Sequence, residues 1–287
     1  MSRGSEAAQQ MLDEFGLDSV IDEDLCDLVY ARGLVFQEVP LSGCEGRIIY
    51  SPSGQTAVVT VNSNTRYRPR KRFSIAHELG HYELKHNKIH CENEGTLDCY
   101  RKGHQEAEAN EFASELLMPA ALFDKAVQGR CFSPALVEEV AEQFGTSVSS
   151  VVYRYLMSGP VPVAAVYSYC GKVVWWRKSQ GMQRRMIDWT GREVPHNSVS
   201  EEWFQDHTVY ATNDIQDVDL NVWFDLGMYR TYTHTSSKRF GMEQMGIRGW
   251  DSWDEAKEDT STGEPMCHEH CFVSRDFGSA LAVIWED

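Results

Sequence analysis

Two histidines and a glutamate in the segment His77-Glu78-Leu79-Gly80-His81 are the residues best suited to chemistry. Residues four apart lie on the same face of a helix, so His77 and His81 can direct two imidazole nitrogens at one point. Glu78 is offset by about 100° and can reach a water at that point without ligating a metal itself. The pattern predicts two ligands and the general base of a metal-assisted hydrolase. The alternative is a pair of histidines satisfied within a helix.

A zinc ion in a hydrolase takes three protein ligands and leaves one position for water, so a third ligand is expected on the next helix. Glu108 is the best candidate, 27 residues after His81 (108 − 81 = 27). It borders an apolar stripe, where a metal would offset the cost of burying an unpaired carboxylate. Glu111, one turn later, is a weaker candidate, and Glu106 is expected to point elsewhere. The alternative for Glu108 is a carboxylate that the helix dipole favours in the first turn.

The segments around the motif predict an α+β domain with a small sheet on which the motif helix can pack. Apolar spacing and turn residues give the approximate bounds of each element. The expected elements are helices over 5–15, 20–32, 69–85 and 105–117, strands over 34–39, 46–50 and 56–61, and a loop over 87–103. A Ser-Pro-Ser-Gly turn joins two of the strands, and the sheet is expected to be antiparallel. Its edge could accept a peptide as an added strand.

Residues 133–158 have the rhythm of a helix–turn–helix unit at the end of this domain. Ser133 is expected to cap and Pro134 to start its first helix, and Gly145 lies in the turn. The first helix carries three acidic residues where phosphates would lie in a DNA-reading unit, Glu138, Glu139 and Glu142. A packing role is therefore expected, and DNA contact is the alternative.

The most convincing domain boundary is the Gly-Pro-Val-Pro segment at 159–162, which predicts one domain over 1–158 and a second over 159–287. The second domain is expected to be α+β and to serve in regulation or substrate recognition. Its clearest strands are expected over 163–169, 172–177 and 279–285. A Cys-His-Glu-His-Cys segment at 267–271 makes a second zinc site a minor alternative, because such crowded ligands reach one ion only in twos or threes.

Composition limits the classes of protein and partner. The chain has 287 residues, a hydrophobic fraction of 42% and a net charge of −16. This length allows one large or two ordinary domains, and the charge argues against general affinity for nucleic acid or anionic membranes. The eight cysteines, with no apolar signal peptide, predict reduced thiols, and no stretch is apolar enough to span a bilayer. A cytoplasmic protein without membrane contact is expected.

Two stretches, residues 72–81 and 106–119, resemble the ImmA/IrrE family of zinc metallopeptidases in content, order and separation. The first reads Arg-Phe-Ser-Ile-Ala-His-Glu-Leu-Gly-His, and the second reads Glu-Ala-Glu-Ala-Asn-Glu-Phe-Ala-Ser-Glu-Leu-Leu-Met-Pro. The resemblance covers about residues 30–157 and implies a zincin-like peptidase domain that includes the helix–turn–helix-like tail. It weakens after residue 158.

The resemblance also implies roles for four residues. The two motif histidines and Glu108 would bind Zn²⁺, and Glu78 would be the catalytic base, taking the proton of the attacking water and passing it to the leaving amine. Tyr100 or His104 could donate to the developing oxyanion. The family resemblance implies a cytoplasmic protein that cleaves a helix–turn–helix transcriptional repressor and so derepresses stress-response or mobile-element genes.

Two rival functions remain open. A non-catalytic regulator or antitoxin-like protein would bind a repressor and keep the zinc fold for its shape alone. A direct DNA-binding regulator would use residues 133–157 and the basic run over 66–72, but the acidic total charge and the three glutamates weigh against it. Proteolysis of a co-expressed repressor would separate the peptidase from the non-catalytic regulator.

Overall fold

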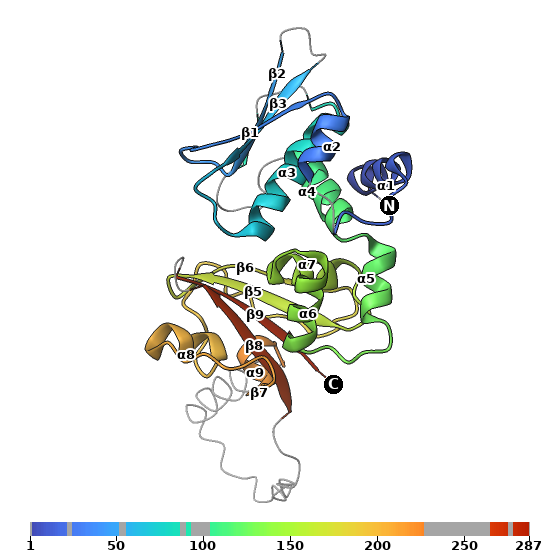
Figure 1. Cartoon of the computed structure of the whole chain (residues 1–287). Helices are drawn as coiled ribbons and strands as arrows, with labels where there is room; N and C mark the ends of the chain where they lie inside the picture. Colours follow the sequence, from blue (N-terminus) through green and yellow to red (C-terminus); the bar gives the residue numbers. More distant parts are fainter. Residues whose placement is uncertain are drawn as a thin grey trace, which may run out of the picture. The chain divides into compact units, whose positions relative to one another are not determined.

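The computed structural model describes residues 2–21, 25–51, 56–86, 104–226, 265–274 and 278–286, together with the backbone of 90–92. The chain divides into two compact units, Met1–Tyr155 and Leu156–Asp287, each with its own sheet and core (Figure 1). Both units mix helices and strands, which confirms the predicted α+β class. The functional division predicted at residue 158 stays a prediction. No helix in the described parts of the chain is long and apolar enough to cross a membrane.

The elements up to the end of α7 begin with two helices and a small sheet and continue with the helices that carry the motif and the acidic candidates. Their bounds in chain order are α1 Arg3–Phe15, α2 Leu25–Ala31, β1 Val35–Val39, β2 Gly46–Tyr50, β3 Ala57–Asn62, α3 Arg68–Glu83, β4 His90–Glu92, α4 His104–Leu117, α5 Ala120–Val127, α6 Pro134–Phe144 and α7 Val148–Ser158. The helices predicted over 69–85 and 105–117 are therefore confirmed as α3 and α4. The helix predicted over 20–32 corresponds to α2, Leu25–Ala31, and Val20 is not helical but joins the core.

The small sheet is mixed, which corrects the prediction of an antiparallel one. Its strand order is β1-β3-β2-β4, and β1 runs parallel to β3, whereas the β2–β3 and β2–β4 pairs are antiparallel. Strand β3 takes a central position because its apolar side chains, such as Val59 and Val61, are buried. Strand β1 is one edge of the sheet, and the side chain of Val35 on it is 52% exposed.

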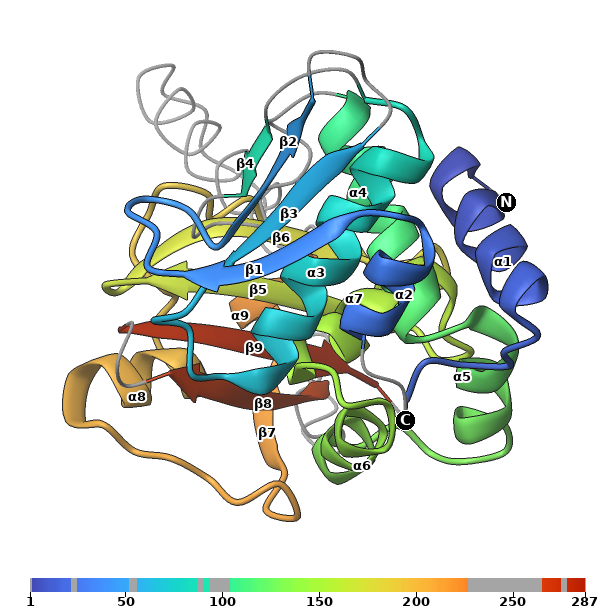
Figure 2. The same ribbon diagram turned by 45° about the horizontal axis from the view of Figure 1, so that its top comes forward.

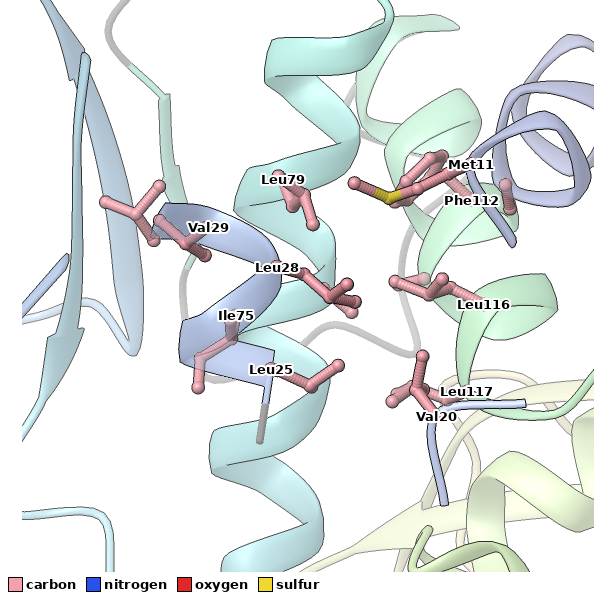
Figure 3. Packing of buried hydrophobic residues seen from close by; sticks show 14 of the residues in the cluster. Met11, Val20, Leu25, Leu28, Val29, Ile75, Leu79, Phe112, Leu116 and Leu117 are labelled. Atoms are coloured by element: carbon pink, nitrogen blue, oxygen red, sulfur yellow. The ribbon is translucent and has the colours of Figure 1, made fainter. Parts of the chain in front are cut away.

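Helix α3 packs against strands β2 and β3 on one side and against α4 on another, and α1 packs along α4 (Figure 2). The core between these helices is apolar and closely packed. In Figure 3, Leu79 of α3, Leu28 of α2, Phe112 and Leu116 of α4 and Met11 of α1 gather in this core, and each is at most 6% exposed. Burial of these side chains holds the two site helices side by side.

Helices α6 and α7 form the predicted helix–turn–helix-like tail. The side chain of Ser133 accepts a backbone N–H of the first turn, and Gly145 ends α6 with a φ of 58°. Buried Arg154 of α7 donates to a carboxylate oxygen of Glu115 at 3.0 Å and to the carbonyl oxygen of Ser114 at 2.9 Å, both on α4. The tail is thus tied to α4 through a buried ion pair. Direct DNA contact by this tail stays an untested alternative.

The second unit is built on a five-stranded antiparallel sheet with strand order β6-β5-β9-β8-β7. Its bounds are β5 Val163–Tyr169, β6 Lys172–Lys178, α8 Val199–Asp206, β7 Gln216–Asp219, α9 Leu220–Trp223, β8 Met266–Ser274 and β9 Ser279–Trp285. The three strands predicted for this unit are confirmed as β5, β6 and β9. Helix α8 packs on β8 and β9, and Trp203 and Trp223 are buried in the core.

Candidate metal centre

Helix α3 carries the two histidines and the glutamate of the motif, and all three side chains are completely buried. Pro69 lies in the first turn of α3, where a backbone N–H has no partner within the helix. His77 and His81 are one turn apart, and their Nε2 atoms lie 3.0 Å from each other. The helix therefore brings the two imidazoles to one point, as their spacing predicts.

The carboxylate at this point belongs to Glu106 of α4. Its Oε2 lies 3.4 Å from Nε2 of His77, and its Oε1 lies 3.6 Å from Nε2 of His81. Among the residues that the structure describes, these three form the one set of His, Cys, Asp or Glu ligand atoms that all lie within 4.8 Å of one another. Ligand atoms placed tetrahedrally at 2.0–2.1 Å from zinc would be about 3.3 Å apart. The observed separations fit a zinc ion.

Each histidine also makes a contact through the ring nitrogen that faces away from this group. Nδ1 of His77 lies 2.9 Å from Oδ1 of Asn110, and Nδ1 of His81 lies 2.9 Å from Nδ1 of His86. An amide oxygen only accepts, so His77 carries its proton on Nδ1 and presents a lone pair on Nε2. Such contacts orient metal-binding histidines. Sequence reasoning missed Asn110 and His86, although Asn110 lies one helical turn after Glu106, on the same face of α4.

Glu108 lies in a different set of contacts. Its Oε2 is 3.0 Å from Nε2 of His86, and its two oxygens are 3.0 and 3.2 Å from Nη1 of Arg3 on α1. Nδ1 of the exposed His104 is 3.4 Å away. Burial by itself raises the pKa of Glu108, but the hydrogen bonds with His86 and Arg3 outweigh burial and leave the pKa below its ordinary value. Glu108 is thus an ionised carboxylate that holds His86.

The structure does not bring Glu108 into the three-residue group, and it contradicts the prediction that Glu106 points elsewhere. The two side chains leave the helix about 200° apart, because consecutive residues turn by 100°. Helix α4 is packed on more than one side: a Cβ at Gly4 of α1 would lie 2.2 Å from the carbonyl oxygen of Glu108, and one at Gly80 of α3 would lie 3.0 Å from the ring of Phe112. An apolar pattern cannot tell which buried face meets the histidines.

Glu78, the predicted base, is buried against strand β2. A Cβ at Gly46 would lie 3.1 Å from Oε1 of Glu78, so a larger residue there would press on the carboxylate. Burial raises the pKa of Tyr50, also on β2, to about 12, and the negative charge of Glu78 adds to the rise. Glu78 therefore lies where α3 meets the sheet, next to His77 in sequence. Its catalytic role stays a prediction.

The remaining candidates from the sequence do not enlarge the group. Glu111, the weaker candidate for a third ligand, is not part of it. Tyr100 lies outside the described residues, and the side chain of His104 is 84% exposed, so the oxyanion donor stays a prediction. The segment over 267–271 forms part of β8, and in the described part of the chain it does not gather three ligands. The minor alternative of a second zinc site there is not supported.

Comparisons with known proteins place part of the chain beside a peptidase family. Residues 32–156 match the family model Peptidase_M78, the IrrE N-terminal-like domain. The structure is similar to that of a Mycobacterium tuberculosis transcriptional regulator, with a TM-score of 0.51 and 12% sequence identity, over 100% of this chain and 77% of that one. At this identity the likeness shows a shared fold. No curated protein matches the chain.

Proposed function

We propose that the chain is a zinc-dependent endopeptidase, because residues 32–156 match the model of the IrrE N-terminal-like domain of the Peptidase_M78 family. Its proposed ligands are His77, His81 and Glu106, and its proposed general base is Glu78. Its proposed substrate is a helix–turn–helix transcriptional repressor. Cleavage of that repressor would derepress stress-response or mobile-element genes.

The convergence of three acceptors carries this proposal. Two imidazole nitrogens of completely buried histidines on α3 lie 3.0 Å apart, and the carboxylate of Glu106 on α4, whose side chain is 13% exposed, lies 3.4 and 3.6 Å from them. Lone pairs and a negative charge at such separations repel one another unless a proton or a cation lies among them. Two histidines and one glutamate are also the donor set of many hydrolytic zinc sites. The residues present therefore fit a Zn²⁺ ion.

The chain's own residues would divide the chemistry between them. A bound Zn²⁺ would supply a Lewis acid for the scissile carbonyl and lower the pKa of a water molecule. Glu78 would take the proton of the attacking water and transfer it to the leaving amine. Asn110 and His86 would keep the Nε2 lone pairs of the two histidines directed at the ion.

The proposed substrate class rests on kinship. The family that the motifs resemble contains peptidases that cleave helix–turn–helix repressors, and a transcriptional regulator shares the fold of this chain. A repressor encoded beside the gene for this chain is accordingly the first substrate to test. The second candidate function is a non-catalytic regulator that binds such a repressor, which the shared fold also favours.

Co-expression with such a repressor tests both functions. The wild-type chain should cleave the repressor and contain one divalent metal ion per molecule. Glu78→Gln should keep the metal and lower the cleavage rate by about 10²–10⁴-fold, which is the usual contribution of a general base. Glu83→Gln is a matched control, because Glu83 lies on the same helix but pairs with Arg32 away from the histidines. It should cleave at the wild-type rate.

Three results would count against the proposal. Wild-type protein that binds no divalent metal would exclude the zinc site. Cleavage by Glu78→Gln at the wild-type rate would remove Glu78 as the base. Metal-loaded wild-type protein that binds the repressor without cutting it would favour the non-catalytic regulator.

A further inference from the structure

Helix α1 lies before the residues that match the peptidase family, yet its first residue reaches toward the candidate metal centre. We propose that Arg3 of α1 is a positioning residue for the centre and acts on His81 through Glu108 and His86. This inference rests on the proposed zinc site. It adds a helix outside the matched domain to the structure that supports that site.

A continuous series of contacts joins Arg3 to His81. Nη1 of Arg3 lies 3.0 and 3.2 Å from the two oxygens of Glu108, and Oε2 of Glu108 lies 3.0 Å from Nε2 of His86. Nδ1 of His86 then lies 2.9 Å from Nδ1 of His81. Three side chains thus connect the N-terminal turn of α1 to a proposed ligand.

The proton positions along this series are consistent with metal binding. A carboxylate only accepts, so His86 donates through Nε2–H to Glu108 and has a lone pair on Nδ1. That lone pair accepts the Nδ1–H of His81, which leaves the lone pair of His81 on Nε2. This nitrogen is the one that faces His77 and Glu106. The contact of Arg3 with Glu108 therefore favours the tautomer of His81 that can bind a metal.

The backbone of Arg3 is placed by the packing of α1, and its side chain, which is 59% exposed, is held by its polar contacts. Gly4 of α1 lies against the backbone of α4, where any Cβ would come within 2.2 Å of a carbonyl oxygen. Ala8 and Met11, further along α1, are buried in the core. The second terminal nitrogen of Arg3 donates to the carbonyl oxygen of Leu84 at 2.9 Å, at the end of α3. The guanidinium thus links α1, α3 and α4 next to the centre.

Arg32 provides a matched control. It also joins α1 to α3 by ion pairs, with Glu14 at 2.7 Å and Glu83 at 2.9 Å, but it has no part in the series that leads to His81. Arg3→Gln and Arg32→Gln each remove one positive charge and ion pairing in this helical region, with Glu108 of α4 for Arg3 and with Glu14 of α1 and Glu83 of α3 for Arg32. Only the first should change the metal centre.

The test compares Zn²⁺ affinity, measured by competition with a chromophoric chelator, in wild-type protein and the two variants. Arg3→Gln should weaken binding, by at most the roughly 10–100-fold that is usual for the direct outer partner of a ligand, and Arg32→Gln should leave it unchanged. The double variant Arg3→Gln/Glu108→Gln should lose no more affinity than Glu108→Gln alone, because both changes break the same series.

A second readout does not need a metal. In zinc-free protein, ¹⁵N NMR of the imidazoles should show His81 with its proton on Nδ1, and Arg3→Gln should shift the population toward the Nε2–H tautomer. Zinc affinity of Arg3→Gln equal to that of the wild type, or an equal loss in Arg32→Gln, would overturn the proposal. If wild-type protein binds no zinc, the proposed function fails, and an unchanged tautomer in Arg3→Gln then overturns this inference separately.

Discussion

Glu108 and Glu269 are both buried carboxylates, one in each unit, and their pKa values move in opposite directions. Glu269 accepts from Nε1 of Trp223 at 2.8 Å and from the backbone N–H and the hydroxyl of Ser200 at 3.2 Å. Burial raises its pKa to about 7, because these neutral donors only partly replace water. At Glu108 burial acts in the same direction, but hydrogen bonds with His86 and with the positively charged Arg3 outweigh it.

The difference shows that a buried carboxylate does not identify a functional site by itself. The carboxylate of Glu269 accepts hydrogen bonds from Trp223 and Ser200, so its hydrogen bonding is satisfied within the protein. Around Glu106 a carboxylate meets two histidine nitrogens, an arrangement that could hold a metal ion. Glu108 lies between these cases: its charge is balanced within the protein, and its partner His86 contacts a proposed ligand. The neighbours of a carboxylate therefore separate a structural group from a candidate ligand.

The largest expected effect distinguishes Glu106 from Glu108. Glu108→Gln should weaken zinc binding by about 10–100-fold, the effect typical of an outer partner. Glu106→Gln should weaken it by more than about 100-fold, because this change removes a proposed ligand itself. Chelator competition measures both. The substitution is the same and the residues are on the same helix, so each variant controls for the other. A larger loss in Glu108→Gln would restore Glu108 as the third ligand.

The next effect concerns Glu269 and pH. Its pKa is near 4.5 in the unfolded chain and about 7 in the folded one. Between these values the folded state holds a proton that the unfolded state has lost. The contribution of Glu269 to the free energy of unfolding is therefore fully present below the unfolded pKa and is lost as pH rises through 7. The full shift is worth about 3 kcal/mol.

Denaturant unfolding at several pH values between about 5 and 8 measures this contribution. All eight tryptophans lie in the second unit, so tryptophan fluorescence follows that unit alone. The free energy of unfolding of wild-type protein should fall with rising pH relative to that of Glu269→Gln, which does not titrate. Parallel pH profiles for the two proteins would mean that Glu269 stays ionised in the folded state.

The smallest effect concerns the turn that places His86. Lys85 has a φ of 58°, and the backbone N–H of His86 donates to the carbonyl oxygen of His81 at 2.9 Å. A non-glycine residue pays about 1 kcal/mol for this left-handed conformation, so Lys85→Gly should raise the free energy of unfolding by about 0.5–1 kcal/mol. Far-UV circular dichroism during denaturation measures the change.

Lys125→Gly is the control for that substitution. Lys125 lies within α5, where glycine should lower the free energy of unfolding by up to about 1 kcal/mol. Equal losses in the two variants would show that Lys85 is not strained. If Lys85→Gly raises the free energy of unfolding and leaves zinc affinity unchanged, the backbone strain at Lys85 is not needed to hold His86 against His81.

The local parts of the fold and site were predictable because they depend on neighbours in the chain. Helical spacing was enough to place His77 and His81 on one face of α3, and capping by Ser133 with Gly145 in the turn was enough to outline α6. The same rules could not pair β1 in parallel with β3, because the partner of a strand depends on which strand has the most apolar surface to bury.

The amino-acid sequence by itself determined the motif helix, the two histidines that converge and the helix that supplies the acid. Only the tertiary structure decided that Glu106 faces the histidines, that Glu108 faces His86, and that Arg3 reaches a residue 105 positions later in the chain. The physical reason is that α4 is buried on more than one side. Periodicity shows that its residues are buried, whereas the packing of α1 and α3 decides which carboxylate meets which partner.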